Sequence, residues 1–373
     1  IGKVAGLSGN FIWLSFLIAS VCALCSAFSY AELSAAFPKA GGEFVYAKKA
    51  FGKNTGIFLG SIISLNGIIS GATVAVGFAG YFSALLPVNL LVASLGIVVL
   101  IFLVNVAGIR QSSIINILFT LIEVGGLLFL IFSFLPNIGD VNYLELPPTG
   151  INGIIAAAAL AFFAYIGFED IVKLAEETKE PEKNIPRALF IASAIVFIVY
   201  TLVALCSVSA LSYEELGNSS SPLADIIQKK HGKTGVIIIS IIALFATSNT
   251  ILSNMLGSSR VILTMAKETT FFKYFAYVSS KRKTPVAALI LILIVMSTFT
   301  LIGEIETIAR IATIFIFITF IIVNFAVIAL RVKEKEMTRP FRIPLNIRNI
   351  PVISVVGILI TAILLGYTIY TLL

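Results

Sequence analysis

Long apolar runs separated by short polar turns repeat along the whole chain. Each run has about twenty residues, the length that an α-helix needs to cross a hydrocarbon core of roughly 30 Å. Turn-forming residues punctuate the runs, as in PKAGGEF at 38–44 and LPNIGD at 135–140. The pattern predicts an all-α polytopic membrane protein with a single transmembrane domain over residues 1–373. The ten expected spans are 10–31, 55–86, 90–108, 113–135, 151–178, 188–211, 235–265, 285–303, 307–330 and 350–373.

Composition supports the membrane class and charge gives an orientation. Hydrophobic residues make up 58% of the chain, charged residues only 12%, and the mean hydropathy is +1.04, which excludes an ordinary soluble domain. The net charge of +7 is compatible with a nucleic-acid partner or with basic cytoplasmic loops, and we favour the loops. The ends after spans one, three, five, seven and nine hold 21 Lys and Arg, against 5 at the others. We therefore expect these five ends to be cytoplasmic in the plasma membrane, and no nucleic-acid partner.

The chemistry of an enzyme or a metal site is not visible in the sequence. Cys22 and Cys25 form a C-x-x-C inside an apolar run, where we interpret them as small packing residues. The single histidine, His231, falls in a polar segment that we interpret as a solvated loop. No nucleophile–base pair is apparent. We expect no catalytic residue, no metal and no cofactor.

Glu123 is a carboxyl group in the middle of the fourth expected span, INILFTLIEVGGLLFLIF. A charged side chain at that depth costs a few kcal/mol even on insertion scales, and such residues face the bundle interior or a water-filled cavity. One interpretation is function, as a group that takes up and releases a proton. The alternative is a structural hydrogen bond to a neighbouring helix.

The stretch FFAYIGFEDIVKLAEE at 162–177 interrupts the fifth expected span with Gly167, Glu169 and Asp170. The helix either ends at Phe168 or is broken in mid-membrane. From 151 to 178 the segment has 28 residues, too long for one straight crossing at about 1.5 Å per residue. A break near 165–168 is favoured, because glycine permits unwinding and carboxylates suit the start of a second half-helix. Broken helices at that depth line cavities.

Two further polar clusters leave packing and pocket lining open. Asn66, Ser70 and Thr73 fall near one face of the second span, and the seventh span carries a polar run from Thr247 to Asn254 that includes Ser248 and Asn249. The segments 46–54 and 222–231 are interpreted as linkers, with short amphipathic surface helices as the alternative.

Several of these segments resemble the amino acid–polyamine–organocation superfamily, the amino acid permeases. The resemblance covers nearly the whole chain and rests on four stretches read together. They are SYAELSAAFPKAGGEFVYAKKAFGK at 29–53, FFAYIGFEDIVKLAEETKEPEKNIPRAL at 162–189, LFATSNTILSNMLGSSRVILTMAKE at 244–268 and RPFRIPLNIRNIP at 339–351. The resemblance implies a five-plus-five inverted-repeat fold of twelve helices. On that alignment we expect most of the first helix, and the last helix, to be missing here, with IGKVAGLSG at 1–9 as the outer end of the first.

The resemblance also implies a substrate site at the break in the sixth family helix. Carried over, Phe163 and Ile166 offer carbonyl groups to an ammonium group, the Phe163 ring covers the substrate, and Gly167 keeps the turn open. Glu169 matches an acidic position linked in some members to gating or proton coupling, whereas Asp170 has no such support and is interpreted as a cap. The substrate-binding residues predicted in all are Phe163, Ala164, Tyr165, Ile166, Gly167, Phe168, Asn66, Ser70, Ser248 and Asn249.

One departure from the family changes the expected coupling. Many members carry a lysine 15 residues after the glycine that is Gly108 here, and this chain has Glu123 instead. Either Glu123 carries a proton or it helps to bind a cation. The expected function is secondary amino acid transport by alternating access, coupled to a proton, or to sodium as the alternative. A polyamine or cationic amino acid carrier and a non-transporting receptor remain open, and the sequence predicts no oligomeric state.

Overall fold

The computed structural model describes residues 1–373 except 40, 220, 270–272, 280–281, 303–304 and 371–373. Among the described residues, nine helical stretches are long and apolar enough to cross a membrane. They are Gly2–Ala36, Lys53–Ser83, Leu90–Ala107, Ile114–Asn137, Gly150–Glu177, Pro181–Ala210, Pro222–Glu268, Ile308–Lys333 and Val352–Tyr370. The span expected at 285–303 is a shorter apolar helix, Val286–Ile302. The protein is therefore an all-helical bundle of apolar helices, apart from one small hairpin.

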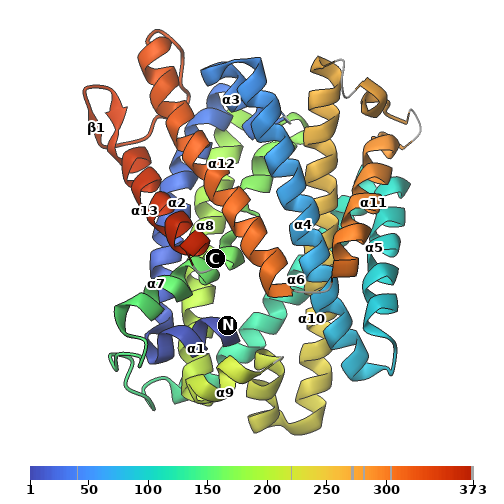
Figure 1. The fold of residues 1–373 in the computed structure, drawn as a ribbon, viewed down its shortest axis with the longest axis vertical. Helices are drawn as coiled ribbons and strands as arrows, with labels where there is room; N and C mark the ends of the chain where they lie inside the picture. Colours follow the sequence, from blue (N-terminus) through green and yellow to red (C-terminus); the bar gives the residue numbers. More distant parts are fainter. Residues whose placement is uncertain (40, 220, 270–272, 280–281, 303–304, 371–373) are drawn as a thin grey trace.

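The helices run roughly parallel to the long axis of the molecule, and the connections gather at its two ends (Figure 1). The α-helices are α1 (Gly2–Ser8), α2 (Ile12–Ala36), α3 (Glu43–Phe51), α4 (Lys53–Leu85), α5 (Leu90–Ala107), α6 (Ile109–Phe134), α7 (Gly150–Ala161), α8 (Pro181–Ala210), α9 (Tyr213–Asn218), α10 (Pro222–Glu268), α11 (Val286–Ile302), α12 (Ile305–Lys333) and α13 (Val352–Tyr370). Short 3₁₀ segments are η1 (Gly9–Phe11), η2 (Leu135–Asn137), η3 (Phe162–Tyr165), η4 (Phe168–Glu177) and η5 (Lys273–Ala276). Helix α3 and the hairpin lie at one end of the bundle, and α1 and α9 lie at the other (Figure 1).

The connection after α2 is not a linker. Residues 43–51 form α3, and the side chains of Phe44, Tyr46 and Ala47 are 0% exposed. The helix packs against α4 and α12. Our linker interpretation of 46–54 was wrong. The three lysines of this short segment indicated a solvated connection, but one of its faces is apolar and packs on the bundle.

The stretch 222–231 is not a linker either, because it is the first part of α10. Gly232 interrupts this helix with φ 59° and ψ −153°. His231, just before it, shares a hydrogen bond of 2.9 Å with Ser133 through Nε2 and is therefore not simply a solvated loop residue.

A two-stranded antiparallel hairpin follows α12. Strand β1 (Asn346–Ile347) pairs with β2 (Ile350–Pro351), with Asn346 opposite Pro351 and Ile347 opposite Ile350. This hairpin lies within the stretch 339–351, which the sequence indicated only as a loop, since strands of two residues leave no alternating pattern to detect.

Helices α4 and α10 pack closely along glycines of α4. A Cβ atom added at Gly60 would lie 2.6 Å from Met265 Sδ, and one at Gly67 would lie 2.4 Å from Ser258 Oγ, both on α10. The Ser258 hydroxyl also donates to the Ser64 carbonyl at 3.2 Å. Small residues permit this close approach of helix backbones, as is common between membrane helices.

Candidate functional site

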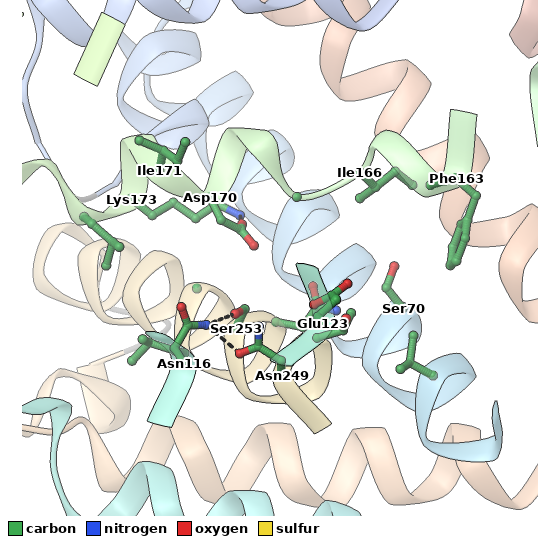
Figure 2. Close-up of a pocket in the computed structure, with 18 of the residues that line it drawn as sticks. Ser70, Asn116, Glu123, Phe163, Ile166, Asp170, Ile171, Lys173, Asn249 and Ser253 are labelled. Carbon is green, nitrogen blue, oxygen red and sulfur yellow. Dashed lines mark hydrogen bonds and ion pairs between the residues drawn. The ribbon is translucent and has the colours of Figure 1, made fainter. Parts of the chain in front are cut away.

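A cavity of about 710 Å³ lies between α4, α6, α8, α10 and the segment that joins α7 to α8. Its walls combine apolar side chains with carboxyl, amide, hydroxyl and amino groups, the composition typical of a small-molecule site. Figure 2 shows the cavity between the broken segment and the polar side chains of the facing helices. The lining residues are Ser70, Val74, Asn116, Ile117, Glu123, Phe163, Ala164, Ile166, Gly167, Asp170, Ile171, Lys173, Leu174, Tyr200, Asn249, Thr250, Ser253, Asn254, Leu256 and Gly257.

The fifth span is interrupted at Ile166 and Gly167. Ile166 is extended, with φ −64° and ψ 135°, and Gly167 has φ 117° and ψ −16°, a conformation that favours glycine. The Gly167 N–H donates to Glu169 Oε2 at 2.9 Å. Among the hydrogen bonds of the described residues, none uses the Ile166 carbonyl as acceptor. Both sides of the break are 3₁₀-helical, so the second limb, η4, is not the α-helix that its apolar period indicated.

The structure brings only part of the predicted segment to the cavity. Phe163, Ala164, Ile166 and Gly167 line it, and Figure 2 shows the Phe163 side chain pointing from the broken segment toward the side of Ser70. Tyr165 does not line it, because its hydroxyl donates to the Phe16 carbonyl at 3.1 Å.

Phe168 also lies away from the cavity. Its ring packs against Tyr30 and Phe320, with ring centroids 5.9 and 5.5 Å apart. Phe168 and Tyr165 therefore anchor the two limbs to neighbouring helices, and the residues between them are held at the cavity.

The two carboxyl groups after the break have different surroundings. Asp170 lines the cavity and accepts from Lys173 Nζ at 2.5 Å, while Lys173 is 5% exposed. Glu169 is 2% exposed and lies behind the cavity wall. Our interpretation of Asp170 as a helix cap was wrong, since no side-chain cap bond is present and the carboxylate pairs with a lysine three residues on.

A chain of amide and hydroxyl groups joins α6 to α10 on the opposite wall. Asn116 Nδ2 donates to Asn249 Oδ1 at 2.9 Å and to Ser253 Oγ at 2.7 Å. Asn249 Nδ2 donates to Thr120 Oγ1 at 2.9 Å. Glu123 lies beside Asn249 in the same wall (Figure 2). The Glu123 carboxyl group therefore faces the cavity rather than lipid.

The remaining predicted residues divide between lining and packing. Ser70 lines the cavity, and its buried Oγ has no hydrogen-bond partner among the described residues. Asn66 is 2% exposed and Ser248 donates to the Leu244 carbonyl within its own helix at 2.6 Å, and neither lines the cavity. The packing alternative therefore fits Asn66 and Ser248.

Seven lining polar residues were absent from our predicted site: Asn116, Asp170, Lys173, Tyr200, Thr250, Ser253 and Asn254. Asn116 is spaced four and seven residues before Thr120 and Glu123, which places all three on one face of a helix, and that spacing was a usable signal. Lys173 was counted only as a basic residue of a cytoplasmic end. Tyr200 gives no signal, because aromatic residues are frequent in apolar helices.

The chain matches the sequence profile of the family described as Amino acid permease over residues 1–372. It is 25% identical to the branched-chain amino acid permease BcaP of Bacillus subtilis, over 96% of this chain and 81% of that protein. The methylthioribose transporter of Bacillus subtilis is 28% identical, over 95% of this chain and 80% of that protein.

Plant relatives are longer than this chain. The vacuolar cationic amino acid transporter 4 of Arabidopsis thaliana is 30% identical over 87% of this chain, and the match spans 58% of that protein. The chain thus spans less than two thirds of such relatives, but the match to the family profile extends over nearly all of it. The chain belongs to the amino acid permease family, whose members are membrane transporters and not enzymes.

Proposed function

We propose that this chain is a secondary transporter that moves an amino acid across the plasma membrane by alternating access, coupled to protons. The observation that carries the proposal is the interrupted helix at Ile166 and Gly167, two residues that line a mixed polar and apolar cavity. The Ile166 carbonyl accepts no hydrogen bond from the described part of the chain. Interrupted helices at membrane depth are tolerated where they line a cavity, and in transporters they mark the substrate site. A five-plus-five inverted repeat, implied by the family, is the fold that we propose.

We further propose how the substrate is held. Its ammonium group donates to the Ile166 carbonyl, which receives no hydrogen bond from the described residues. It also donates to the Phe163 carbonyl, which receives a long bond of 3.4 Å from the Ile166 N–H. The Phe163 ring, which points from the broken segment toward the side of Ser70 (Figure 2), is placed to cover the substrate side chain. Ser70 and Asn249 offer hydroxyl and amide groups from the facing helices.

The membrane orientation that we propose follows from charge. The Lys- and Arg-rich ends after α2, α10 and α12 lie at the end of the bundle that holds α3 and the hairpin (Figure 1). Excess basic residues mark cytoplasmic loops. We therefore assign this end to the cytoplasm and the end with α1 and α9 to the outside.

Exchange in proteoliposomes tests transport directly. Vesicles loaded with unlabelled amino acid are expected to take up the labelled form by counterflow, and empty vesicles are not expected to do so beyond equilibration. Competition among leucine, alanine, arginine and putrescine then gives the substrate class. Saturable binding without counterflow would identify a receptor instead of a transporter, and no recognition of any amino acid by the full protein would contradict the proposal.

A cationic substrate is the second candidate. Two carboxyl groups, Glu123 and Asp170, line the cavity, and Lys173 compensates only one of them. Cationic amino acid transporters are also among the relatives. Stronger competition by arginine or putrescine than by leucine would favour this candidate over a neutral amino acid.

Coupling is expected to depend on Glu123 or Glu169. A pH gradient of one unit drives about tenfold accumulation when one proton accompanies one neutral substrate at zero membrane potential. We expect Glu123→Gln, Glu169→Gln or both to reduce this accumulation toward equilibration, because an amide cannot carry the proton. Accumulation is measured with labelled substrate at an imposed gradient. If both variants accumulate substrate as the wild type does, neither residue carries the coupling proton.

A further inference from the structure

Glu43 is a buried carboxyl group outside the nine candidate spans, in the first turn of α3. Its side chain is 0% exposed. The Tyr30 hydroxyl of α2 donates to Glu43 Oε1 at 3.1 Å. Among the described residues, neither Glu43 Oε2 nor the hydroxyl of the buried Tyr46 has a hydrogen-bond partner. A buried oxygen without a hydrogen-bond partner costs free energy, and binding a further ligand or a proton removes that cost.

Glu43 adjoins the second limb of the broken helix. A Cβ atom added at Gly42, its chain neighbour, would lie 3.2 Å from Val172 Cγ2 and 3.5 Å from Lys173 Cγ, both on η4. Lys173 acts electrostatically on Glu43, Glu169 and Asp170 at once. The loop before α3 and the limb that bounds the cavity therefore meet beside Lys173.

The charges of this group do not balance when every member is ionised. Glu43, Glu169 and Asp170 carry three negative charges, and Lys173 carries one positive charge. Helix α12 also packs against α3, but its Lys333 does not compensate this group. Lys333 Nζ donates to the Ala50 carbonyl at 2.7 Å, at the opposite end of α3 from Glu43. Unpaired buried charges are costly and neutralise by taking up a proton.

Burial raises the pKa of Glu43 above the ordinary range of a carboxyl group. Lys173 opposes this shift, as does the backbone N–H at the start of α3, and Asp170 adds to it. The raised pKa of Glu43 agrees with the charge count, because a proton on one of the buried carboxyl groups reduces the excess of negative charge.

We propose that Glu43 is a proton-binding residue of the transport cycle, at the cytoplasmic end of the path that the coupling proton follows. The inference rests on the proposed transport function. The proton enters with the substrate, passes from the carboxyl groups near the cavity to Glu43 Oε2, and leaves to water on the cytoplasmic side. Protonated Glu43 no longer attracts Lys173, so the contact between α3 and η4 weakens and that limb can move. Ionised Glu43 restores the contact.

Glu43→Gln tests this proposal, because the amide keeps the shape of the side chain and cannot exchange a proton. The variant is expected to retain counterflow and to lose the accumulation driven by a pH gradient, from about tenfold to about onefold. Glu336→Gln, the same change at an exposed site, is the matched control and is expected to accumulate substrate as the wild type does.

The outcomes separate the inference from the proposed function. Absence of counterflow in the wild type contradicts transport itself. Counterflow with full accumulation in Glu43→Gln overturns the role of Glu43, as does a wild type whose accumulation follows a sodium gradient alone.

Two further measurements apply if Glu43→Gln transports too little to assay. The folded-state pKa of Glu43 is raised, so the stability that it contributes is present at low pH and is lost as pH rises through that pKa. The variant should therefore gain unfolding temperature relative to the wild type as pH rises, and a difference that is independent of pH overturns the proposal. Tyr30→Phe removes a donor that favours the ionised form and should shift the pH profile of uptake upward; an unchanged profile also contradicts it.

Discussion

Replacing Arg331 with methionine is expected to lower the free energy of unfolding by up to about 3–5 kcal/mol, because the change breaks a buried ion pair. Among the described residues, Glu32 then keeps only one charged partner, Arg339, whose Nε lies 3.3 Å from Oε1. Arg331 on α12 is 1% exposed and Glu32 on α2 is 2% exposed. Arg331 Nε donates to Glu32 Oε1 at 2.8 Å, and Nη2 donates to Oε2. The Ile343 N–H donates to the same Oε2 at 2.9 Å, so the carboxylate also fixes the loop after α12.

Unfolding of the purified protein in detergent, followed by denaturant, measures this loss. The double variant Glu32→Gln with Arg331→Met is expected to be more stable than Arg331→Met alone, since it removes both charges. Lys183→Met is the control at an exposed pair, Lys183 with Glu180 at 3.0 Å, where the side chains are 60% and 65% exposed. That change should cost less than about 1 kcal/mol. An equal, small loss at both sites would contradict the structural role of the buried pair.

Replacing Gly167 with alanine is expected to reduce uptake at least about tenfold, which corresponds to about 1.4 kcal/mol. A Cβ atom at this position meets no atom within 4 Å, so no clash is involved. The cost comes from φ 117°, which side chains other than glycine rarely adopt. Relief of that strain rotates the peptide groups at the break and moves the Ile166 carbonyl away from the cavity.

Gly139→Ala separates backbone strain from the loss of the site. Gly139 has φ 108° and also has no atom within 4 Å of an added Cβ, but it lies in an exposed turn after η2. Both variants are expected to lose similar stability, and only Gly167→Ala is expected to lose uptake. Initial rates of labelled substrate entry, corrected for the amount of reconstituted protein, provide the comparison. Equal uptake by the two variants would show that the geometry of the break is not required.

The helical bundle was predictable because the length of an apolar run is set by the membrane and not by tertiary contacts. Outside the membrane spans, and at the break within one of them, the sequence was less informative. Helix α3 carries Lys48 and Lys49 in its last turn, which suggests a solvated segment, yet Phe44 and Tyr46 are fully buried. The pattern of the stretch after Gly167 is that of an α-helix, but the chain forms a 3₁₀ segment, because hydrophobic spacing does not separate these two helices over ten residues.

The candidate site was predictable where a residue conflicted with its surroundings. Glu123 and Gly167 stand out in apolar runs, and both line the cavity. Asp170 and Lys173 were misjudged because their pairing depends on a local geometry that the sequence does not display. Phe168 and Tyr165 belong to the same motif but turn to other helices, since the break rotates successive side chains out of register.

The glycines of α4 have a mechanical consequence. With Met265 and Ser258 of α10 within 2.6 Å of where a Cβ would stand at Gly60 and Gly67, sliding one helix along the other would drive side chains into backbone. Close-packed interfaces of this kind resist shear and transmit displacement. Helices α4 and α10 are therefore expected to move as one rigid unit. In the transport cycle that we propose, the movement that exposes the cavity to each side in turn takes place at the break between η3 and η4.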